Sequence, residues 1–138
     1  MTQYISTSEK ETRKIAQQLG RKIKTGVIAL KGELGAGKTI FAQGFAKGLR
    51  IKEKIISPTF VLIRQHKIPQ TEKIFYHIDL YRIEKPKSLQ ELGIDEILSN
   101  PNNIILIEWA EKLKKLPKDA IKISITKKGS HTRLITIS

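Results

Sequence analysis

The residues with the clearest chemistry form the segment Gly32-Glu33-Leu34-Gly35-Ala36-Gly37-Lys38-Thr39. It satisfies the pattern G-x-x-x-x-G-K-[ST], in which a glycine-rich loop cradles phosphates. Glycines allow backbone conformations that other residues avoid, so successive N–H groups can point at phosphate oxygens. The segment therefore predicts a nucleoside triphosphate site, with Lys38 on the β- and γ-phosphates and the Thr39 hydroxyl on Mg²⁺.

The residues on either side of this loop fit that prediction. Val27 to Leu30 form an apolar run that predicts a buried strand, and residues 38–49 carry apolar side chains at helical spacing. A helix that begins near Lys38 would add the positive end of its dipole to the phosphate site. The predicted nucleotide-binding residues are Glu33, Leu34, Gly35, Ala36, Gly37, Lys38, Thr39 and Ile40.

Two acids are candidates to complete the site. A phosphate-binding loop works with a carboxylate at the end of a neighbouring strand, which holds Mg²⁺ or orients water. Asp79 follows the run Phe75 to Ile78, and Glu108 follows the run Ile104 to Ile107. Ligands bind beyond the carboxyl ends of strands in open α/β sheets, so both acids are candidate catalytic and metal-binding residues. The residue order alone does not decide which lies nearer the metal.

Three further residues could take part in the chemistry. Thr59 lies in a loop after the predicted 38–49 helix, where a hydroxyl can sense a γ-phosphate as switch loops do. His77 alternates with Asp79 along a strand, so the two side chains can share a face, although a lone histidine is more often structural. Trp109 directly follows Glu108 and is either a core residue or a stacking surface beside the nucleotide.

The remaining pattern predicts an α/β fold. Ser8 and Glu11 resemble a capping box at the start of an amphipathic helix over 9–23. Strands are expected at 60–63, 74–80 and 104–107, short helices at 88–98, with Ser88 as a cap, and at 109–116, and a closing hairpin from 121–125 and 134–137. We expect one P-loop NTPase-like domain over residues 1–138, with a mixed, mostly parallel central sheet flanked by helices and a C-terminal antiparallel hairpin.

Composition limits the possible functions. The chain has no cysteine, which excludes disulfides and thiolate chemistry. No apolar run is long enough to span a membrane, and the N-terminus lacks a signal-peptide layout, so a cytoplasmic location is the default. The formal charge of +13 is concentrated in residues 1–54, at +8, and 110–138, at +6. Because 20 of the 26 basic residues are lysines, a merely solubilising surface is favoured over specific nucleic-acid binding.

Five segments together resemble the TsaE family, also called YjeE, of small bacterial P-loop ATPases required for the threonylcarbamoyladenosine modification of tRNA. They are the phosphate loop, Ser57-Pro58-Thr59-Phe60, Tyr76-His77-Ile78-Asp79-Leu80-Tyr81-Arg82, Leu92-Gly93-Ile94 and Leu106-Ile107-Glu108-Trp109. The loop alone is not specific to this family, but the combination is. The resemblance covers about residues 5–116.

The resemblance implies roles for individual residues and favours ATP as the nucleotide. Thr39 and Glu108 would hold Mg²⁺, and Asp79 would belong to the network of Mg²⁺ and water. Thr59 would be the switch-like hydroxyl, and Thr7 would approach the adenine. The implied activity is ATP hydrolysis that is slow in the isolated protein and depends on partner proteins.

The implied partners are the TsaD and TsaB proteins. TsaD transfers the threonylcarbamoyl group, and ATP hydrolysis by TsaE would reset the complex between turnovers. The chain departs from the family at Lys87-Ser88, where acids are frequent, and in a short basic C-terminal hairpin without a recognisable motif. These departures leave the details of partner contact open.

Two other functions compete with this interpretation. A small-molecule kinase would use the same loop and acids, but no segment reads as an arginine-bearing lid. A basic RNA-binding module that uses ATP as a switch would explain the charged flanks, which also leave an indirect or weak tRNA contact open.

Overall fold

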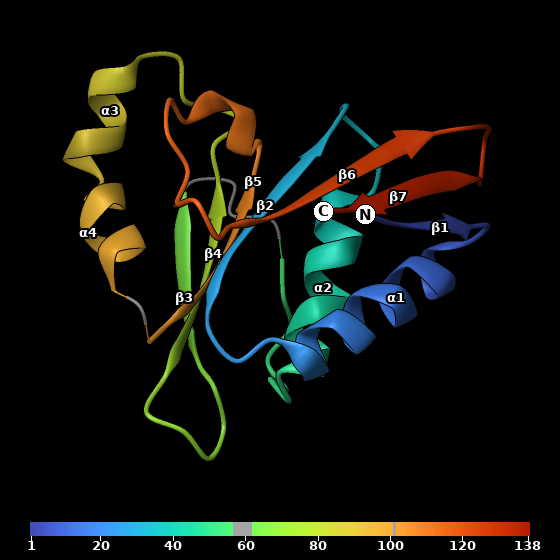
Figure 1. Cartoon of the computed structure of the whole chain (residues 1–138), viewed down its shortest axis with the longest axis horizontal. Coiled ribbons are helices and arrows are strands. Elements are labelled where there is room, and N and C mark those ends of the chain that lie inside the picture. The colour runs from blue at the N-terminus through green and yellow to red at the C-terminus, as the bar shows by residue number, and fades with distance from the viewer. Residues whose placement is uncertain (57–61, 101) are drawn as a thin grey trace.

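A computed structural model describes residues 1–56, 62–100 and 102–138. Within them, seven strands form one sheet in the order β1-β7-β6-β2-β5-β4-β3 (Figure 1). The strands are β1 (Thr2–Ser6), β2 (Gly26–Gly32), β3 (Ile63–Lys67), β4 (Ile74–Asp79), β5 (Ile104–Glu108), β6 (Ile121–Lys127) and β7 (Arg133–Ile137). The helices are α1 (Glu9–Lys22), α2 (Lys38–Gly48), α3 (Pro86–Glu91) and α4 (Ile94–Ser99), with a 3₁₀ turn η1 (Ala110–Lys112).

The sheet is mixed, with its parallel strands in the middle. Strand β2 pairs in parallel with β5 and β6, and β4 pairs in parallel with β5. The outer pairs β1–β7, β6–β7 and β3–β4 are antiparallel. Helices α1 and α2 cover one face, while α3 and α4 cover the other (Figure 1). The predicted α/β class and the C-terminal hairpin are therefore confirmed.

The central strands are buried on both faces, which explains their continuous apolar sequences. In β2, Ile28 and Leu30 pack with the α1–α2 layer, whereas Val27 and Ala29 pack in the cluster on the opposite face. Strand β5 divides its side chains between the two clusters in the same alternating way. Packing on both faces holds β2 and β5 in place. Strand β2 leads directly into the phosphate loop, and β5 ends at Glu108.

Helix α2 is held in place by close backbone approach to α1. A Cβ atom built on Gly44 would clash with the Arg13 carbonyl oxygen, and one on Gly48 would clash with the Gln17 carbonyl oxygen. Only glycine leaves room for such contact. Because α2 begins directly after the phosphate loop, this packing also positions the loop.

The start of α1 follows the predicted capping pattern with one difference. Ser8 is the N-cap, and its hydroxyl oxygen accepts from the Glu11 N–H at 3.1 Å. The Glu11 carboxylate does not bond to the Ser8 N–H, as a full capping box requires. It accepts instead from the N–H and hydroxyl of Thr7.

Several predicted elements differ from those observed. The helix expected at 88–98 is two helices, because Gly93 between them has a left-handed backbone, with φ 71°. Helix α3 begins at Pro86, so Ser88 lies inside it and is not its cap. The helix expected at 109–116 shrinks to η1, because Trp109 has φ 61° and the backbone is extended again at Leu113.

The strands show three further differences. Residues 60 and 61 of the strand expected at 60–63 lie outside the described residues, and β3 begins at Ile63 and continues through polar residues. Strand β1 was not predicted, and pairing with β7 stabilises it. In the described parts of the chain, no helix is long and apolar enough to cross a membrane.

Candidate nucleotide site

The phosphate loop joins β2 to α2, as its sequence predicts. Gly35 and Gly37 have φ of 79° and 105°, a backbone region that favours glycine. The Ala36 N–H donates to the Glu33 carbonyl oxygen at 3.0 Å and closes the turn. Gly37 is the N-cap of α2 and has no side chain to cap the first turn, so that end of the helix is suited to an anion.

Lys38 lies within the loop and against Trp109. Its Nζ atom donates to the Gly32 and Glu33 carbonyl oxygens at 2.5 and 2.9 Å, and it lies 4.1 Å from the centroid of the Trp109 ring. The residue is only 5% exposed. Burial lowers the pKa of the Lys38 amine, and the surrounding carboxylates, Glu108 first among them, oppose that shift.

The Glu108 carboxylate, at the end of β5, contacts side chains from both α2 and β4. Its Oε1 atom accepts from the Thr39 hydroxyl at 3.3 Å, and its Oε2 atom lies 2.5 Å from His77 Nε2. Both Glu108 and His77 are buried. The His77 ring stacks on Phe75 with an angle of 9° between the planes, and among the described residues its Nδ1 atom has no hydrogen-bond partner. His77 is therefore packed on one side and directed at Glu108 on the other.

Asp79 lies beside Glu108 because β4 and β5 are parallel neighbours. The register places Asp79 directly opposite Glu108 at the carboxyl ends of the two strands. Asp79 is 8% exposed, and its Oδ1 atom accepts from the Tyr81 N–H at 3.0 Å. The structure thus brings together the two acids that the sequence singled out, next to Thr39.

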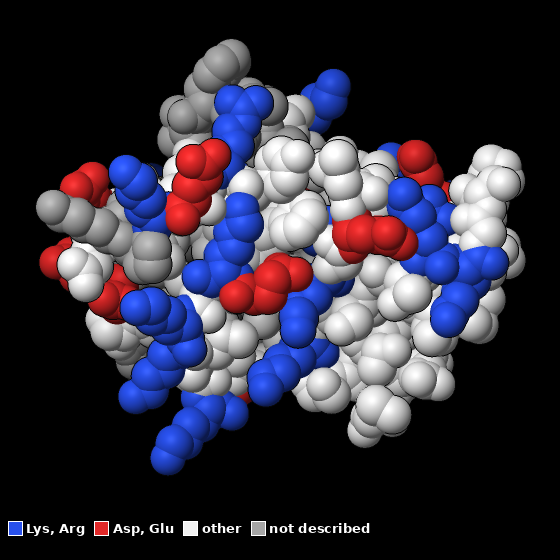
Figure 2. Space-filling view, turned by 90° about the horizontal axis from the view of Figure 1, so that it is seen from above, with Lys and Arg blue, Asp and Glu red and all other residues white. Residues whose placement is uncertain are grey.

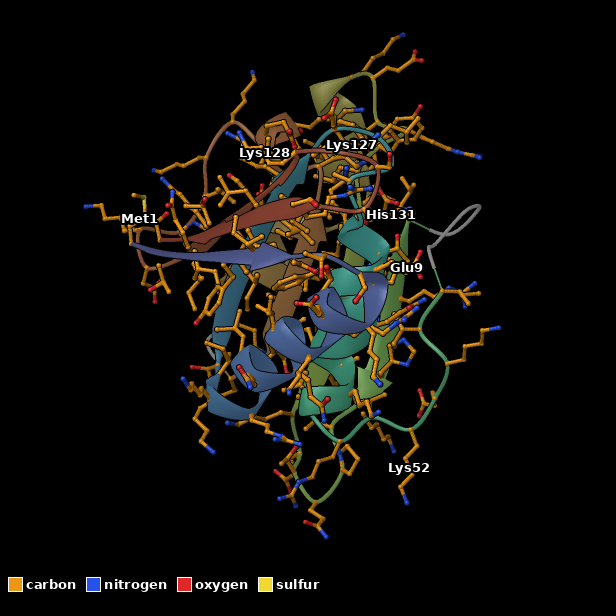
Figure 3. All side chains as sticks on the ribbon, turned by 90° about the vertical axis from the view of Figure 1, so that its right-hand side faces the viewer. Met1, Glu9, Lys52, Lys127, Lys128 and His131 are labelled. Atoms are coloured by element: carbon orange, nitrogen blue, oxygen red, sulfur yellow. The ribbon has the colours of Figure 1, made fainter. Side chains whose placement is uncertain are left out.

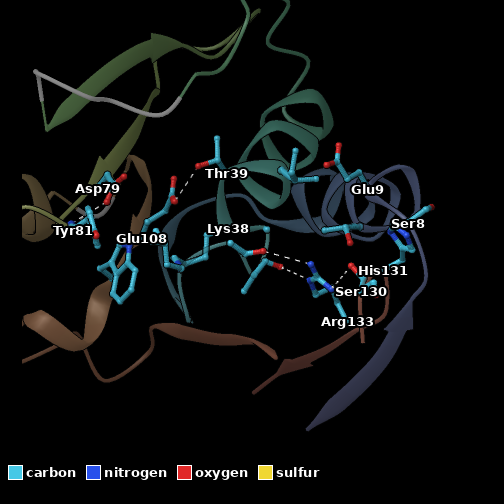
Figure 4. A pocket seen from close by; sticks show the side chains of 17 residues that line it. Ser8, Glu9, Lys38, Thr39, Asp79, Tyr81, Glu108, Ser130, His131 and Arg133 are labelled. Atoms are coloured by element: carbon cyan, nitrogen blue, oxygen red, sulfur yellow. Dashed lines mark hydrogen bonds between the residues drawn. The ribbon is translucent and has the colours of Figure 1, made fainter. Parts of the chain in front are cut away.

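A cavity of about 420 Å³ joins these groups (Figure 4). Loop residues 34–40, Asp79 and Glu108 line it, and so do residues from both ends of the chain. The start of α1 contributes Ser8, Glu9 and Thr12, and the β6–β7 segment contributes Ser130, His131 and Arg133. Figure 3 shows Glu9 and His131 on the same side of the molecule.

Arg133 connects the C-terminal hairpin to the phosphate loop. Its Nε atom donates to the Ala36 carbonyl oxygen at 3.1 Å, and a terminal nitrogen donates to the Gly35 carbonyl oxygen at 3.5 Å (Figure 4). Its other terminal nitrogen donates to carbonyl oxygens of the β6–β7 turn, including that of Gly129. Arg133 is not among the site residues predicted from the sequence, because the hairpin carries no motif and lies far from the loop along the chain.

Two predicted site residues do not line the cavity, and a third is outside the described part of the chain. Thr7 is exposed, bonds to Glu11 and does not line the cavity, although its neighbour Ser8 does. Glu33 does not line it either; its carbonyl oxygen accepts from Lys38. Thr59 lies outside the described residues. The roles of these three residues stay predictions.

The residues at the Thr39–Glu108 contact suit Mg²⁺. In the described part of the chain, no group of three histidine or carboxylate residues could hold a metal on its own. Mg²⁺ at phosphate-transfer sites does not need such a group, because phosphate oxygens and waters supply most of its ligands. One hydroxyl and one carboxylate beside a phosphate loop match that pattern.

The β2-loop-α2 unit, with acids at the ends of the two neighbouring strands, defines a P-loop NTPase-like protein. The family model described as "Threonylcarbamoyl adenosine biosynthesis protein TsaE" matches residues 6–135. The chain belongs to the TsaE family, which confirms the resemblance seen in its sequence.

Individual relatives agree with this assignment. The chain is 39% identical over 133 residues to the tRNA threonylcarbamoyladenosine biosynthesis protein TsaE of Rickettsia typhi, covering 94% of this chain and 90% of that one. It is 36% identical to the protein of the same name from Bacillus subtilis, covering 96% and 82%. The crystal structure of Bacillus subtilis YdiB superposes with a TM-score of 0.80 at 32% identity, covering 99% of this chain and 83% of that one.

Proposed function

We propose that this protein is a Mg²⁺-dependent ATPase that acts in the cytoplasm in the formation of N6-threonylcarbamoyladenosine in tRNA. The observation that carries the proposal is the contact between the Thr39 hydroxyl and the Glu108 carboxylate at 3.3 Å, directly behind the phosphate loop. A hydroxyl and a carboxylate at this position are the two protein ligands that Mg²⁺ takes beside a nucleotide in P-loop proteins.

Each group at the site has a role in this proposal. The loop N–H groups and the start of α2 bind the phosphates, and Lys38 exchanges its carbonyl contacts for phosphate oxygens. Thr39 and Glu108 hold Mg²⁺, which neutralises charge on the β- and γ-phosphates when bound. Asp79 orients water beside the metal, and Thr59 senses the γ-phosphate. In this proposal the adenine of ATP lies toward the start of α1, where Ser8 lines the cavity.

Hydrolysis is favoured over transfer to a small acceptor. Kinases need arginines that close over the phosphates. Among the residues that the structure describes, Arg133 is the one arginine lining the cavity, and its guanidinium is bonded to loop and turn carbonyl oxygens. The small-molecule kinase therefore remains the second candidate, and phosphate transfer to an acceptor at a rate well above hydrolysis would replace the proposal.

The proposed partner is the TsaD–TsaB threonylcarbamoyl transferase complex. Family membership supports this choice, because relatives such as the Rickettsia typhi protein are named for the same tRNA modification. ATP hydrolysis would reset that complex between turnovers. The product would then be a conformational change in the partners and not a phosphorylated metabolite.

The decisive experiment combines nucleotide binding with turnover. Mg-ATP should change the fluorescence of Trp109, the sole tryptophan, which packs on Lys38. Hydrolysis should be slow in the isolated protein and faster with TsaD–TsaB. The ATPase assignment fails if Mg-ATP neither binds nor is hydrolysed. The partner assignment fails if TsaD–TsaB forms no complex with the protein and leaves both binding and hydrolysis unchanged.

A further inference from the structure

A second cavity lies at the end of the molecule away from the phosphate loop. Its volume is about 680 Å³. The ends of α1 and α2, the loop before β2 and the β3–β4 turn surround it, at the lower end of the molecule in Figure 1. Its lining reaches Ile104, the first residue of β5, whereas the nucleotide site lies at Glu108, the last. The two cavities therefore lie at opposite ends of the sheet.

The charged side chains that line this second cavity are all cationic. They come from three separate segments, and among the described residues no Asp or Glu lines the cavity. The cavity is hereafter called the basic cavity. Its cationic residues are Arg21, Lys24, Lys47, Arg50 and Lys73.

In the described parts of the chain, no carboxylate forms an ion pair with these cations. The ion pairs Arg13–Glu9, His66–Glu53 and His77–Glu108 all lie outside the basic cavity. Lys73 Nζ donates to the Lys24 carbonyl oxygen at 2.8 Å, and this acceptor carries no formal charge. The face of the protein seen in Figure 2 differs, because acidic side chains lie among its lysines and arginines there.

Helix dipoles explain part of this arrangement. Arg21 and Lys47 lie in the last turns of α1 and α2, where a cation stabilises the negative end of a helix. Lys24, Arg50 and Lys73 lie beyond the helices, so this explanation does not reach them. The left-handed backbone of Arg50, with φ 67°, belongs to the C-terminal cap of α2, because the Arg50 N–H donates to the Lys47 carbonyl oxygen at 3.0 Å and the Ile51 N–H donates to the Ala46 carbonyl oxygen at 3.1 Å. The concentration of charge therefore points to a ligand.

We propose that the basic cavity binds the phosphate backbone of RNA. Lysine ammonium groups are mobile point charges that suit phosphates of any sequence, and three of the five cations are lysines. The net charge of +13 favours a polyanion, and the family acts in tRNA modification. The inference goes beyond the proposed ATPase, because this site lies away from the nucleotide and both can be occupied together.

The test compares the RNA affinity of a variant that lacks three positive charges in the basic cavity with that of a variant that lacks three positive charges elsewhere on the surface. Arg21→Gln, Lys24→Gln and Lys47→Gln together remove three exposed cations and no side-chain hydrogen bond found in the structure. The matched control is Lys114→Gln, Lys115→Gln and Lys118→Gln, which removes three exposed lysines that line neither cavity. Affinity for a fluorescent unmodified tRNA transcript is measured by anisotropy at several salt concentrations.

The cavity variant should bind the transcript about tenfold more weakly than the control, and its salt dependence should be shallower by about two to three counterions. Equal affinity and equal salt dependence in the two variants would overturn the proposal. A cavity variant that keeps RNA binding and loses binding to polyglutamate would replace RNA with an acidic protein segment. The Trp109 response to Mg-ATP, measured in parallel, should be the same in both variants, so failure of the ATPase proposal is seen separately.

A measurement on the unaltered protein covers the case in which the triple variant does not fold. Bound tRNA should protect Lys24, Lys47 and Lys73 from acetylation by a soluble amine reagent, while Lys114 and Lys115 remain reactive. Uniform protection of all five lysines, or none, would contradict a site in the basic cavity.

Discussion

His77 Nε2 lies 2.5 Å from one oxygen of the Glu108 carboxylate, while the other oxygen of that carboxylate accepts from the Thr39 hydroxyl. His77 is fully buried and stacks on Phe75, so its ring has little freedom to turn. The histidine therefore sets the direction in which Glu108 faces the phosphate loop. In metal sites, groups that orient a ligand in this way matter nearly as much as the ligand itself.

Replacing His77 should weaken Mg²⁺ binding and so lower ATP turnover when Mg²⁺ is limiting. His77→Leu removes the contact that orients Glu108, so turnover should fall ~10–100-fold at limiting Mg²⁺. His77→Gln should retain more activity, because its amide nitrogen can reach about the same position as Nε2. Mg²⁺ titrations of turnover and of Trp109 fluorescence would compare the two. Equal losses in both variants would mean that the ring serves packing alone.

Removing the Glu108 carboxylate should impair hydrolysis more than nucleotide binding. Glu108→Ala leaves the loop N–H groups and Lys38 intact but deprives Mg²⁺ of its carboxylate, so turnover should fall at least about 100-fold. Glu111→Gln is the control, because Glu111 is an exposed acid that acts on Lys38 only through its charge. Unaltered hydrolysis in Glu108→Ala would refute the assigned role.

Lys38→Ala should abolish nucleotide binding. The variant loses the cation closest to the phosphates and also the contact with the Trp109 ring. Titration with Mg-ATP should give no Trp109 response and no heat by calorimetry. Lys31→Ala, at an exposed lysine near the end of β2, should bind as the unaltered protein does. Undiminished ATP affinity in Lys38→Ala would move the triphosphate site away from the loop.

Arg133→Ala should weaken nucleotide binding by about tenfold, because the Gly35 and Ala36 carbonyl oxygens lose a charged hydrogen-bond donor and the loop becomes less ordered. The nucleotide affinity of Arg133→Lys should lie between those of the unaltered protein and Arg133→Ala, since an ammonium cannot reach the loop and the turn together as the guanidinium fork does. Calorimetric titration with Mg-ATP would measure this order. Identical affinities in all three proteins would show that the hairpin does not support the loop.

Gly44→Ala should destabilise the protein by about 1–3 kcal/mol, because the added methyl group would overlap the Arg13 backbone where α1 and α2 meet. Gly129→Ala is the matched control, since its nearest contact would be the Thr132 Cβ at 4.0 Å. Denaturant unfolding of both variants would measure the difference. Equal stability would indicate that α1 and α2 can move apart at little cost.

The sequence alone determined the elements whose signal is local. The phosphate loop, the strand before it and the helix after it are encoded in consecutive residues. Asp79 and Glu108 could be selected because each follows an apolar run, and apolar runs of that length form buried strands. The helix expected at 109–116 was wrong, because the hydrogen bond from the Trp109 N–H to Leu30 depends on a strand that is distant along the chain.

Only the tertiary structure decided which distant residues meet. Parallel pairing of β2 with β6, followed by antiparallel pairing of β6 with β7, brings Arg133 to the loop. Parallel pairing of β4 with β5 brings Asp79 to Glu108. The basic cavity likewise gathers cationic side chains from three segments. Hydrophobic periodicity shows that a strand is buried, but strand order follows from how all the helices and strands pack together. A residue whose role depends on a neighbouring strand therefore leaves no local signal in the sequence.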